Sequence, residues 1–280
     1  MLSGRWDLTI DAGTETYPSW VEFNGASSRF VGRVGSARPI ETVKMDGDGV
    51  YWSLPPQYES RKTNLEFAGR LEGDVLVGTC EGDKGEHLTF RGTRAPSLDR
   101  TGEPVWGEAI DLIQSDLDNW TMRNPEWENN WQIVDDMLYN RGVGSDIVLK
   151  QPFMDFRLIA EYKYPAGSNS GIYLRGRYEF QIVDDFGHAP GVGTSGAIYG
   201  FLTPQRSAVK PADEWNVAEI TLLGRHVTVV LNGDKVIDSQ EIPGITGGAL
   251  DSNEGEAGTI FLQGDHGPVV FRRLTLTPAT

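Results

Sequence analysis

Short runs in which apolar and polar residues alternate make up most of the chain. Between residues 2 and 94 they extend from GRWDLTI to HLTFRGTRAP, and Gly, Asn and Asp separate them. A period of two is typical of antiparallel strands with one buried and one solvated face. This region therefore predicts a small antiparallel β-barrel or β-sandwich, with three tryptophans that are either core residues or sugar-stacking platforms: Trp6, Trp20 and Trp52.

The alternating runs from residue 131 onward are longer and better marked. They include DFRLIAEYKYP, NSGIYLRGRYEFQIVDD and VVFRRLTLTP, and NGDK at 232–235 is typical of a hairpin turn. Many strands joined by turns, without intervening helical patterns, favour two packed sheets over alternating strands and helices. We expect an antiparallel jelly-roll β-sandwich over this part of the chain.

A stretch rich in Pro, Gly and charge, PSLDRTGEPVWG, separates these two regions. Such composition is typical of a connection between domains. The predicted organisation is a small β-domain over 1–97, a linker over 98–104 and the jelly-roll domain over 105–280.

Charge and composition limit the classes of partner and the kinds of site that the protein can have. The formal net charge is −15, which opposes attraction to nucleic acid or to an anionic membrane surface. Cys80 is the only cysteine, so an internal disulfide and a thiolate zinc site are excluded. Without a long apolar stretch or a signal-like start, the sequence as written predicts a cytoplasmic protein, and removal of a leader would make it periplasmic or secreted. The sequence gives no indication of the oligomeric state.

The strand RGRYEFQIVDD carries the candidate chemistry. Alternation directs Tyr178, Phe180 and Ile182 into the core, so the odd-numbered side chains would line the other face. These are Arg175, Arg177, Glu179 and Gln181. Such a face is either a plain solvated exterior or a binding surface.

Two further segments favour a binding surface. GTIFLQGDHG presents Gln263 and then Asp265 and His266 at a Gly-flanked turn, and SGAIYG places Tyr199 close to glycines. Small residues beside polar ones let a ligand approach the backbone. Arginine, carboxylate, amide, imidazole and phenol groups together suit sugar hydroxyls and carbonyls.

These motifs resemble the 3-keto-disaccharide hydrolase family, a group of bacterial concanavalin A-like jelly rolls. The resemblance covers about residues 106–277 and is most specific in NSGIYLRGRYEFQI and LQGDHGPVVFR. It implies an enzyme for small sugars oxidised to a ketone at carbon 3. Cleavage would proceed by proton abstraction at carbon 2, elimination at carbon 1 and hydration. Two alternatives stay open, a non-catalytic lectin-like glycan-binding module and direct hydrolysis of unoxidised glycans.

Roles follow as hypotheses. The predicted catalytic residues are His266 and Glu179 for proton transfer and Arg175 for the enolate. The predicted substrate-binding residues are Asn169, Arg177, Gln181, Tyr199 and Gln263. No cofactor is required by the sequence, although a divalent metal ion is compatible with Glu179, Asp184, Asp265 and His266.

Overall fold

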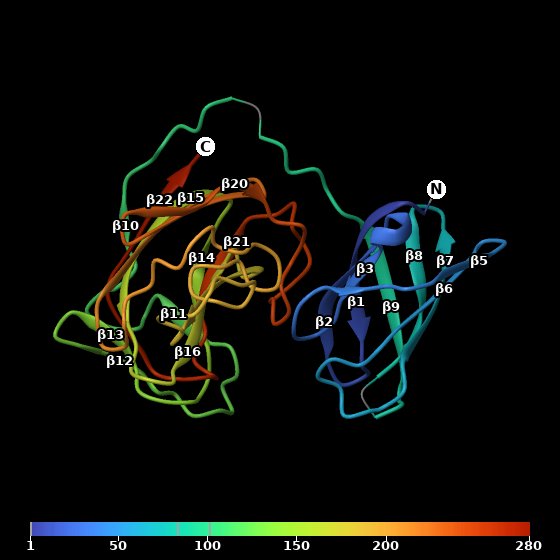
Figure 1. Ribbon diagram of the computed structural model, residues 1–280, viewed down its shortest axis with the longest axis horizontal. Coiled ribbons are helices and arrows are strands. Elements are labelled where there is room, and N and C mark those ends of the chain that lie inside the picture. The colour runs from blue at the N-terminus through green and yellow to red at the C-terminus, as the bar shows by residue number, and fades with distance from the viewer. Residues whose placement is uncertain (1, 83, 101) are drawn as a thin grey trace. The chain divides into compact units, whose positions relative to one another are not determined.

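The computed structural model describes residues 2–82, 84–100 and 102–280 and divides the chain into two compact units (Figure 1). The first unit holds residues 1–97 together with 244–255, and the second holds 98–243 and 256–280. The sequence analysis placed 244–255 in the second domain, whereas its contacts group it with the first unit. Among the described residues, no helix combines the length and the apolar character needed to cross a membrane.

The first unit is one antiparallel sheet in the order β4-β3-β2-β1-β9-β8-β7-β6-β5, interrupted by a single 3-10 turn, η1 (Gly25–Ser27). The sheet curls around one core, as Figure 1 shows. The strands are β1 (Gly4–Asp11), β2 (Thr16–Phe23), β3 (Arg29–Val31), β4 (Arg38–Pro39), β5 (Val43–Asp46), β6 (Gly49–Leu54), β7 (Leu65–Glu72), β8 (Val75–Glu81) and β9 (His87–Arg94).

Alternating residues of these strands form the core of the first unit. Trp52 stacks on Phe67 with ring centroids 4.9 Å apart, and Trp6 and Trp20 are each at most 1% exposed. The three tryptophans are therefore core residues, not exposed platforms. Only glycine fits at position 78, because a Cβ there would lie 2.4 Å from the Phe90 ring. The predicted small antiparallel β-domain, a barrel or a sandwich, is confirmed as a single curled sheet.

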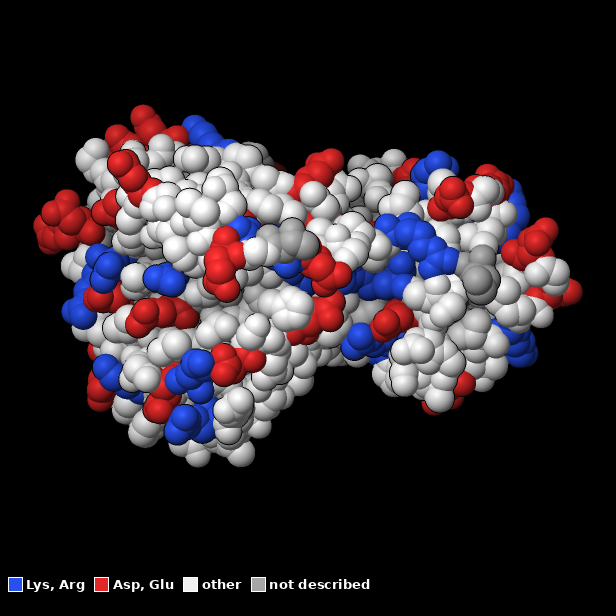
Figure 2. Space-filling model, turned by 90° about the horizontal axis from the view of Figure 1, so that it is seen from above, with Lys and Arg blue, Asp and Glu red and all other residues white. Residues whose placement is uncertain are grey.

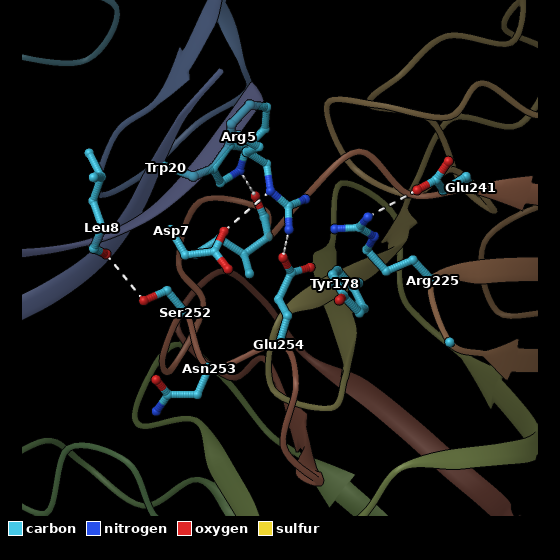
Figure 3. A network of polar contacts seen from close by, with 12 residues as sticks. Arg5, Asp7, Leu8, Trp20, Tyr178, Arg225, Glu241, Ser252, Asn253 and Glu254 are labelled. Atoms are coloured by element: carbon cyan, nitrogen blue, oxygen red, sulfur yellow. Dashed lines mark hydrogen bonds and ion pairs between the residues drawn. The ribbon is translucent and has the colours of Figure 1, made fainter. Parts of the chain in front are cut away.

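Segment 244–255 is tied to the first unit by specific contacts (Figure 3). Trp20 donates its indole N–H to the Ile245 carbonyl oxygen at 2.9 Å, and Ser252 donates to the Leu8 carbonyl oxygen at 3.2 Å. The side chain of Glu254 is paired with the Arg5 guanidinium. These bonds satisfy buried polar groups that the sequence pattern could not assign to a partner.

The second unit consists of two antiparallel sheets, in the orders β12-β13-β22-β15-β18-β19-β20 and β11-β14-β21-β16-β17, with β10 paired to β22. Its strands are β10 (Ile110–Asp111), β11 (Trp120–Met122), β12 (Trp131–Val134), β13 (Met137–Asn140), β14 (Ile147–Phe153), β15 (Asp155–Lys163), β16 (Asn169–Leu174), β17 (Tyr178–Val183), β18 (Asn216–Leu223), β19 (His226–Leu231), β20 (Asp234–Glu241), β21 (Gly258–Leu262) and β22 (Val269–Ala279). The predicted jelly-roll sandwich is confirmed.

Even-numbered residues of β16, β17 and β21 fill the space between the two sheets. Ile172, Phe180 and Leu262 have no measurable exposure, and Tyr162 of β15 packs edge-on against Phe180. The odd-numbered residues of the same strands are thereby left on the other face of the five-stranded sheet. On the face of the second unit that Figure 2 draws, acidic and basic side chains are interspersed. This face therefore has no continuous positive surface that would attract a polyanion.

Candidate functional site

A row of side chains, here called the polar row, runs from the central strand β21 across β16 to the edge strand β17 of the five-stranded sheet. In the register of the strands, Tyr173 of β16 stands opposite Glu179 of β17 on one side and opposite Phe261 of β21 on the other. The Tyr173 and Phe261 rings stack with centroids 3.9 Å apart. Because all three residues belong to regular strands, the sheet holds them in fixed relative positions.

Glu179 is the central ionisable group of this row. Its side chain is buried, and the Tyr173 hydroxyl donates a hydrogen bond to its Oε2 at 3.0 Å. Gly171 stands beside it, where a Cβ would lie only 2.7 Å from Oε1 of Glu179. Because glycine has no side chain, position 171 leaves room for the carboxyl group of Glu179.

Burial raises the pKa of Glu179 to about 8, since a carboxylate loses its hydration there. The hydrogen bond from Tyr173 and the charge of His266 act in the opposite direction, and the charges of Asp265 and Asp146 raise the pKa further. With a pKa of about 8, both the protonated and the ionised form of this carboxyl group are populated near neutral pH, whereas an ordinary glutamate is almost fully ionised.

Glu179→Gln is expected to stabilise the fold, increasingly so as pH rises. A raised pKa means that the folded state binds the proton more tightly than the unfolded state. The stabilisation from protonation is complete below the ordinary value of 4.5 and is lost as pH rises through about 8. At about 1.4 kcal/mol per pKa unit, the difference reaches a few kcal/mol. Thermal melting of the wild type and of Glu179→Gln at pH 5 and pH 8.5 measures this difference in stability. An equal difference in melting temperature at both pH values would contradict the raised pKa of Glu179.

His266 follows β21 in a turn that is anchored on both sides. The Gly264 N–H donates to Oδ1 of Asp146 at 2.8 Å, and the Asn140 amide donates to the Gly267 carbonyl oxygen at 2.9 Å. The imidazole Nδ1 of His266 is hydrogen-bonded to Asp265. This hydrogen bond, supported by the charges of Asp265 and Glu179, raises the pKa of His266 above its usual 6.5. The half-exposed imidazole therefore holds a proton more tightly than an ordinary histidine does.

Backbone hydrogen bonds hold Gln263 beside Gly171 and Tyr199 beside Glu179. The Gln263 N–H donates to the Gly171 carbonyl oxygen at 3.0 Å, and the Tyr199 N–H donates to the Glu179 carbonyl oxygen at 2.9 Å. Gln181 pairs across the hairpin with Gly171. Within the described structure, the side-chain oxygens of Asn169 and Gln263 are buried without a hydrogen-bond partner. These two carbonyl oxygens are therefore candidates to accept hydrogen bonds from sugar hydroxyls.

Arg175 does not lie in this group, contrary to the sequence-based hypothesis. It occupies the turn between β16 and β17 with a positive φ of 53°, which interrupts the alternation of side chains. Its fully buried guanidinium instead donates to the Gly224 carbonyl oxygen and, at 3.3 Å, to the Tyr178 hydroxyl. Arg175 is thus anchored on the core side of the sheet, and its enolate-stabilising role stays a prediction.

Arg177 is also held at the β16–β17 turn. Its Nη1 donates to the Glu256 carbonyl oxygen at 2.8 Å, and its side chain is buried. This bond anchors the segment that leads into β21. Its predicted contact with substrate stays a prediction.

The four residues considered as metal ligands are not assembled into a metal site. Among the described residues, no three His, Cys, Asp or Glu side chains have an arrangement that could hold a metal ion. Asp184 accepts from the Gly167 N–H at 2.8 Å, and Asp265 holds His266. Among the described residues, Glu179, Asp184, Asp265 and His266 therefore do not form the metal-binding group that the sequence was compatible with.

Sequence reasoning missed three residues of the site, Tyr173, Arg123 and Asp146. Arg123 lies over the Phe261 ring at 5.1 Å and contacts Asp146 Oδ2 at 3.2 Å. The shared parity of β16 and β17 could have indicated Tyr173, because odd-numbered residues of the two strands pair across the hairpin and Tyr173 faces Glu179. Arg123 and Asp146 come from distant parts of the chain and have no local signal.

Comparison with known proteins adds an independent observation. The family model described as 3-keto-alpha-glucoside-1,2-lyase-like domain matches residues 108–277, which contain the whole polar row and the His266 turn. A search of the curated proteins found no match.

Solved structures similar to this chain include three from Parabacteroides distasonis ATCC 8503, all provisionally described as glycosyl hydrolases. The first is 27% identical with a TM-score of 0.50 and covers 64% of this chain and 92% of its own. The second is 26% identical with a TM-score of 0.48, covering 61% and 98%. The third is 21% identical with a TM-score of 0.48, covering 61% and 93%.

Proposed function

The chain belongs to the 3-keto-alpha-glucoside-1,2-lyase-like domain family, and from this premise we propose that its second unit cleaves glycosides whose glucose ring carries a ketone at carbon 3. Family membership makes the chain a carbohydrate-active protein related to glycoside hydrolases. The proposal adds the oxidised substrate and the elimination chemistry. The observation that supports it most is a buried carboxyl group, Glu179, with a pKa of about 8, coupled to the imidazole of His266.

The chemistry begins at carbon 2, because the neighbouring ketone acidifies its proton. A base removes that proton and the electron pair forms an enolate with the carbon 3 carbonyl. The enolate then re-forms the carbonyl and expels the carbon 1 substituent, whose oxygen takes a proton from an acid. Addition of water across the resulting double bond, with hydroxyl to carbon 1 and a proton to carbon 2, gives free 3-keto-glucose.

Glu179 and His266 supply a base and an acid in the same place. In the reactive form Glu179 is ionised and His266 is protonated, and each charge favours the other. The high proton affinity of Glu179 makes its carboxylate a stronger base than an ordinary one, as proton abstraction from carbon requires. The more exposed His266 donates to the departing oxygen, while Asn169 and Gln263 accept bonds from sugar hydroxyls.

Direct hydrolysis of an unoxidised glycoside is less well supported. It needs two carboxyl groups free to act on the bond, separated by about 5–5.5 Å or about 6.5–9.5 Å. Asp146 is already engaged by the Gly264 N–H and by Arg123, and Asp265 is bonded to His266. Glu179 is left as the carboxyl group with proton-transfer capacity.

Incubation with a 3-keto-α-glucoside in deuterated water tests the proposal. We expect release of the carbon 1 substituent, deuterium at carbon 2 of the 3-keto-glucose product, and no turnover of the matched unoxidised glucoside. Turnover of the unoxidised glucoside without deuterium incorporation would support direct hydrolysis instead. Saturable binding of the 3-keto-α-glucoside without turnover would support a glycan-binding module.

A further inference from the structure

A separate cavity of about 310 Å³ lies in the first unit. Its lining comes from one end of the curled sheet, where β1, β3 and β8 finish and β7 and β9 begin. Small barrels of this kind can hold one small ligand within the mouth of the sheet. The volume lies at the lower end of the range of small-molecule sites, roughly 300–1,000 Å³.

The floor of the cavity is apolar and continuous with the core. Two of its side chains, Phe30 and Phe67, contact each other with ring centroids 4.7 Å apart and an interplanar angle of 56°. An apolar cavity of about 150 Å³ already admits benzene, so one of twice that volume suits a two-ring molecule. The apolar lining consists of Ile10, Phe30, Leu65, Phe67, Cys80 and Leu88.

The rim is acidic, because four glutamates and a single arginine, Arg33, are among the residues that line the cavity. Three of these glutamates are paired with an arginine, and Glu86 accepts a hydrogen bond from the Lys84 backbone N–H at 2.7 Å. The pairing reduces the attraction of the rim for a cation, and the remaining negative charge disfavours an anionic ligand. Its carboxylate and guanidinium groups can still hydrogen-bond a hydroxyl or amine at the entrance. The pairs are Glu15 with Arg33, Glu59 with Arg38 and Glu81 with Arg61.

An exposed apolar lip stands at the entrance. Tyr58 is 62% exposed and Val34 is 51% exposed, and both line the cavity. The loop that carries Val34 is fixed by backbone bonds from Gly248 to the Arg33 carbonyl oxygen at 2.9 Å and from Gly247 to the Gly35 carbonyl oxygen at 3.2 Å. A fixed opening with exposed apolar side chains is typical of a site that receives an apolar molecule.

We propose that this cavity binds a neutral, ring-bearing small molecule, with its rings on the Phe30–Phe67 floor and a hydroxyl or amine group at the rim. The site does not depend on the catalytic proposal for the second unit. It gives the first unit a ligand-binding function of its own.

Fluorescence titration of the full chain with N-phenylnaphthylamine tests this site. The probe is neutral and has an anilinonaphthalene ring system, and its fluorescence intensity increases in apolar surroundings. We expect saturable enhancement with one probe per chain and a micromolar dissociation constant. Anilinonaphthalene sulfonate carries the same rings and a negative charge, and should bind about tenfold more weakly or worse because its sulfonate would lose hydration without a partner. Equal binding of both probes would overturn the assignment of a neutral ligand.

Ala12→Trp should block the cavity, because Ala12 lines it and is only half-buried. Ala26→Trp is the matched control, since Ala26 is exposed in η1, between the end of β2 and the start of β3 and thus away from the mouth. Tyr58→Ser is a second test at an exposed position and should weaken probe binding several-fold without disturbing the core. Unchanged titrations for folded Ala12→Trp and for Tyr58→Ser would overturn the site.

Discussion

Glu179→Gln is expected to lower turnover of a 3-keto-α-glucoside by on the order of 10²-fold or more, because an amide cannot accept the carbon 2 proton. The amide oxygen can still accept the hydrogen bond that Tyr173 now donates at 3.0 Å. The variant should therefore fold, and its higher melting temperature at alkaline pH separates lost chemistry from lost structure. Rates of release at saturating substrate, measured across pH 5–9, check the prediction.

Two further variants sharpen this test. Gly171→Ala keeps the carboxyl group but forces it to move, because a Cβ at 171 would lie 2.7 Å from Oε1 of Glu179. Turnover should fall, and the melting temperature should fall as well, because Glu179 is buried and has little room to move. Glu219→Gln removes a carboxyl group from an exposed position on β18 and serves as the matched control. A normal rate for Glu179→Gln, or an equal loss in Glu219→Gln, would contradict the role of Glu179 as base.

Alternation along the strands predicted most of the fold and part of the site. A period of two places Tyr178, Phe180 and Ile182 in the core and Glu179 and Gln181 on the opposite face, as the structure has them. The rule is reliable there because these residues lie within one regular strand, and one face of that strand must pack against the core. Burial of the polar face itself was not predictable, since it depends on which segments cover the sheet.

The rule failed where the backbone leaves the strand conformation. Arg175 has the same parity as Glu179, but its positive φ turns the side chain toward the Gly224 carbonyl oxygen. Parity cannot be carried through a turn of unknown geometry. Arg123 and Asp146 show a second limit, because the contacts of Arg123 with Asp146 and with the Phe261 ring arise from strand order, which only tertiary packing determines.

His266→Ala is also expected to lower turnover of a 3-keto-α-glucoside with an alkyl leaving group, by on the order of 10²-fold. An alkoxide is a poor leaving group, so its oxygen needs a proton as the bond to carbon 1 breaks. The imidazole is well suited to this role because its hydrogen bond with Asp265 raises its pKa above the usual 6.5. His226→Ala, at an exposed position on β19, is the matched control and should leave the rate unchanged.

The leaving group distinguishes an acid from a merely structural histidine. A nitrophenolate departs without protonation, so His266→Ala should lose much less activity on a nitrophenyl 3-keto-glucoside than on the alkyl glucoside. Glu179→Gln should lose activity on both, since carbon 2 must be deprotonated in either case. The protonated histidine also lowers the pKa of Glu179 through its charge, and His266→Ala should therefore move the pH at which Glu179 becomes a base upward. Equal losses on the two substrates, without a shift in the pH profile, would leave His266 with no part in proton transfer.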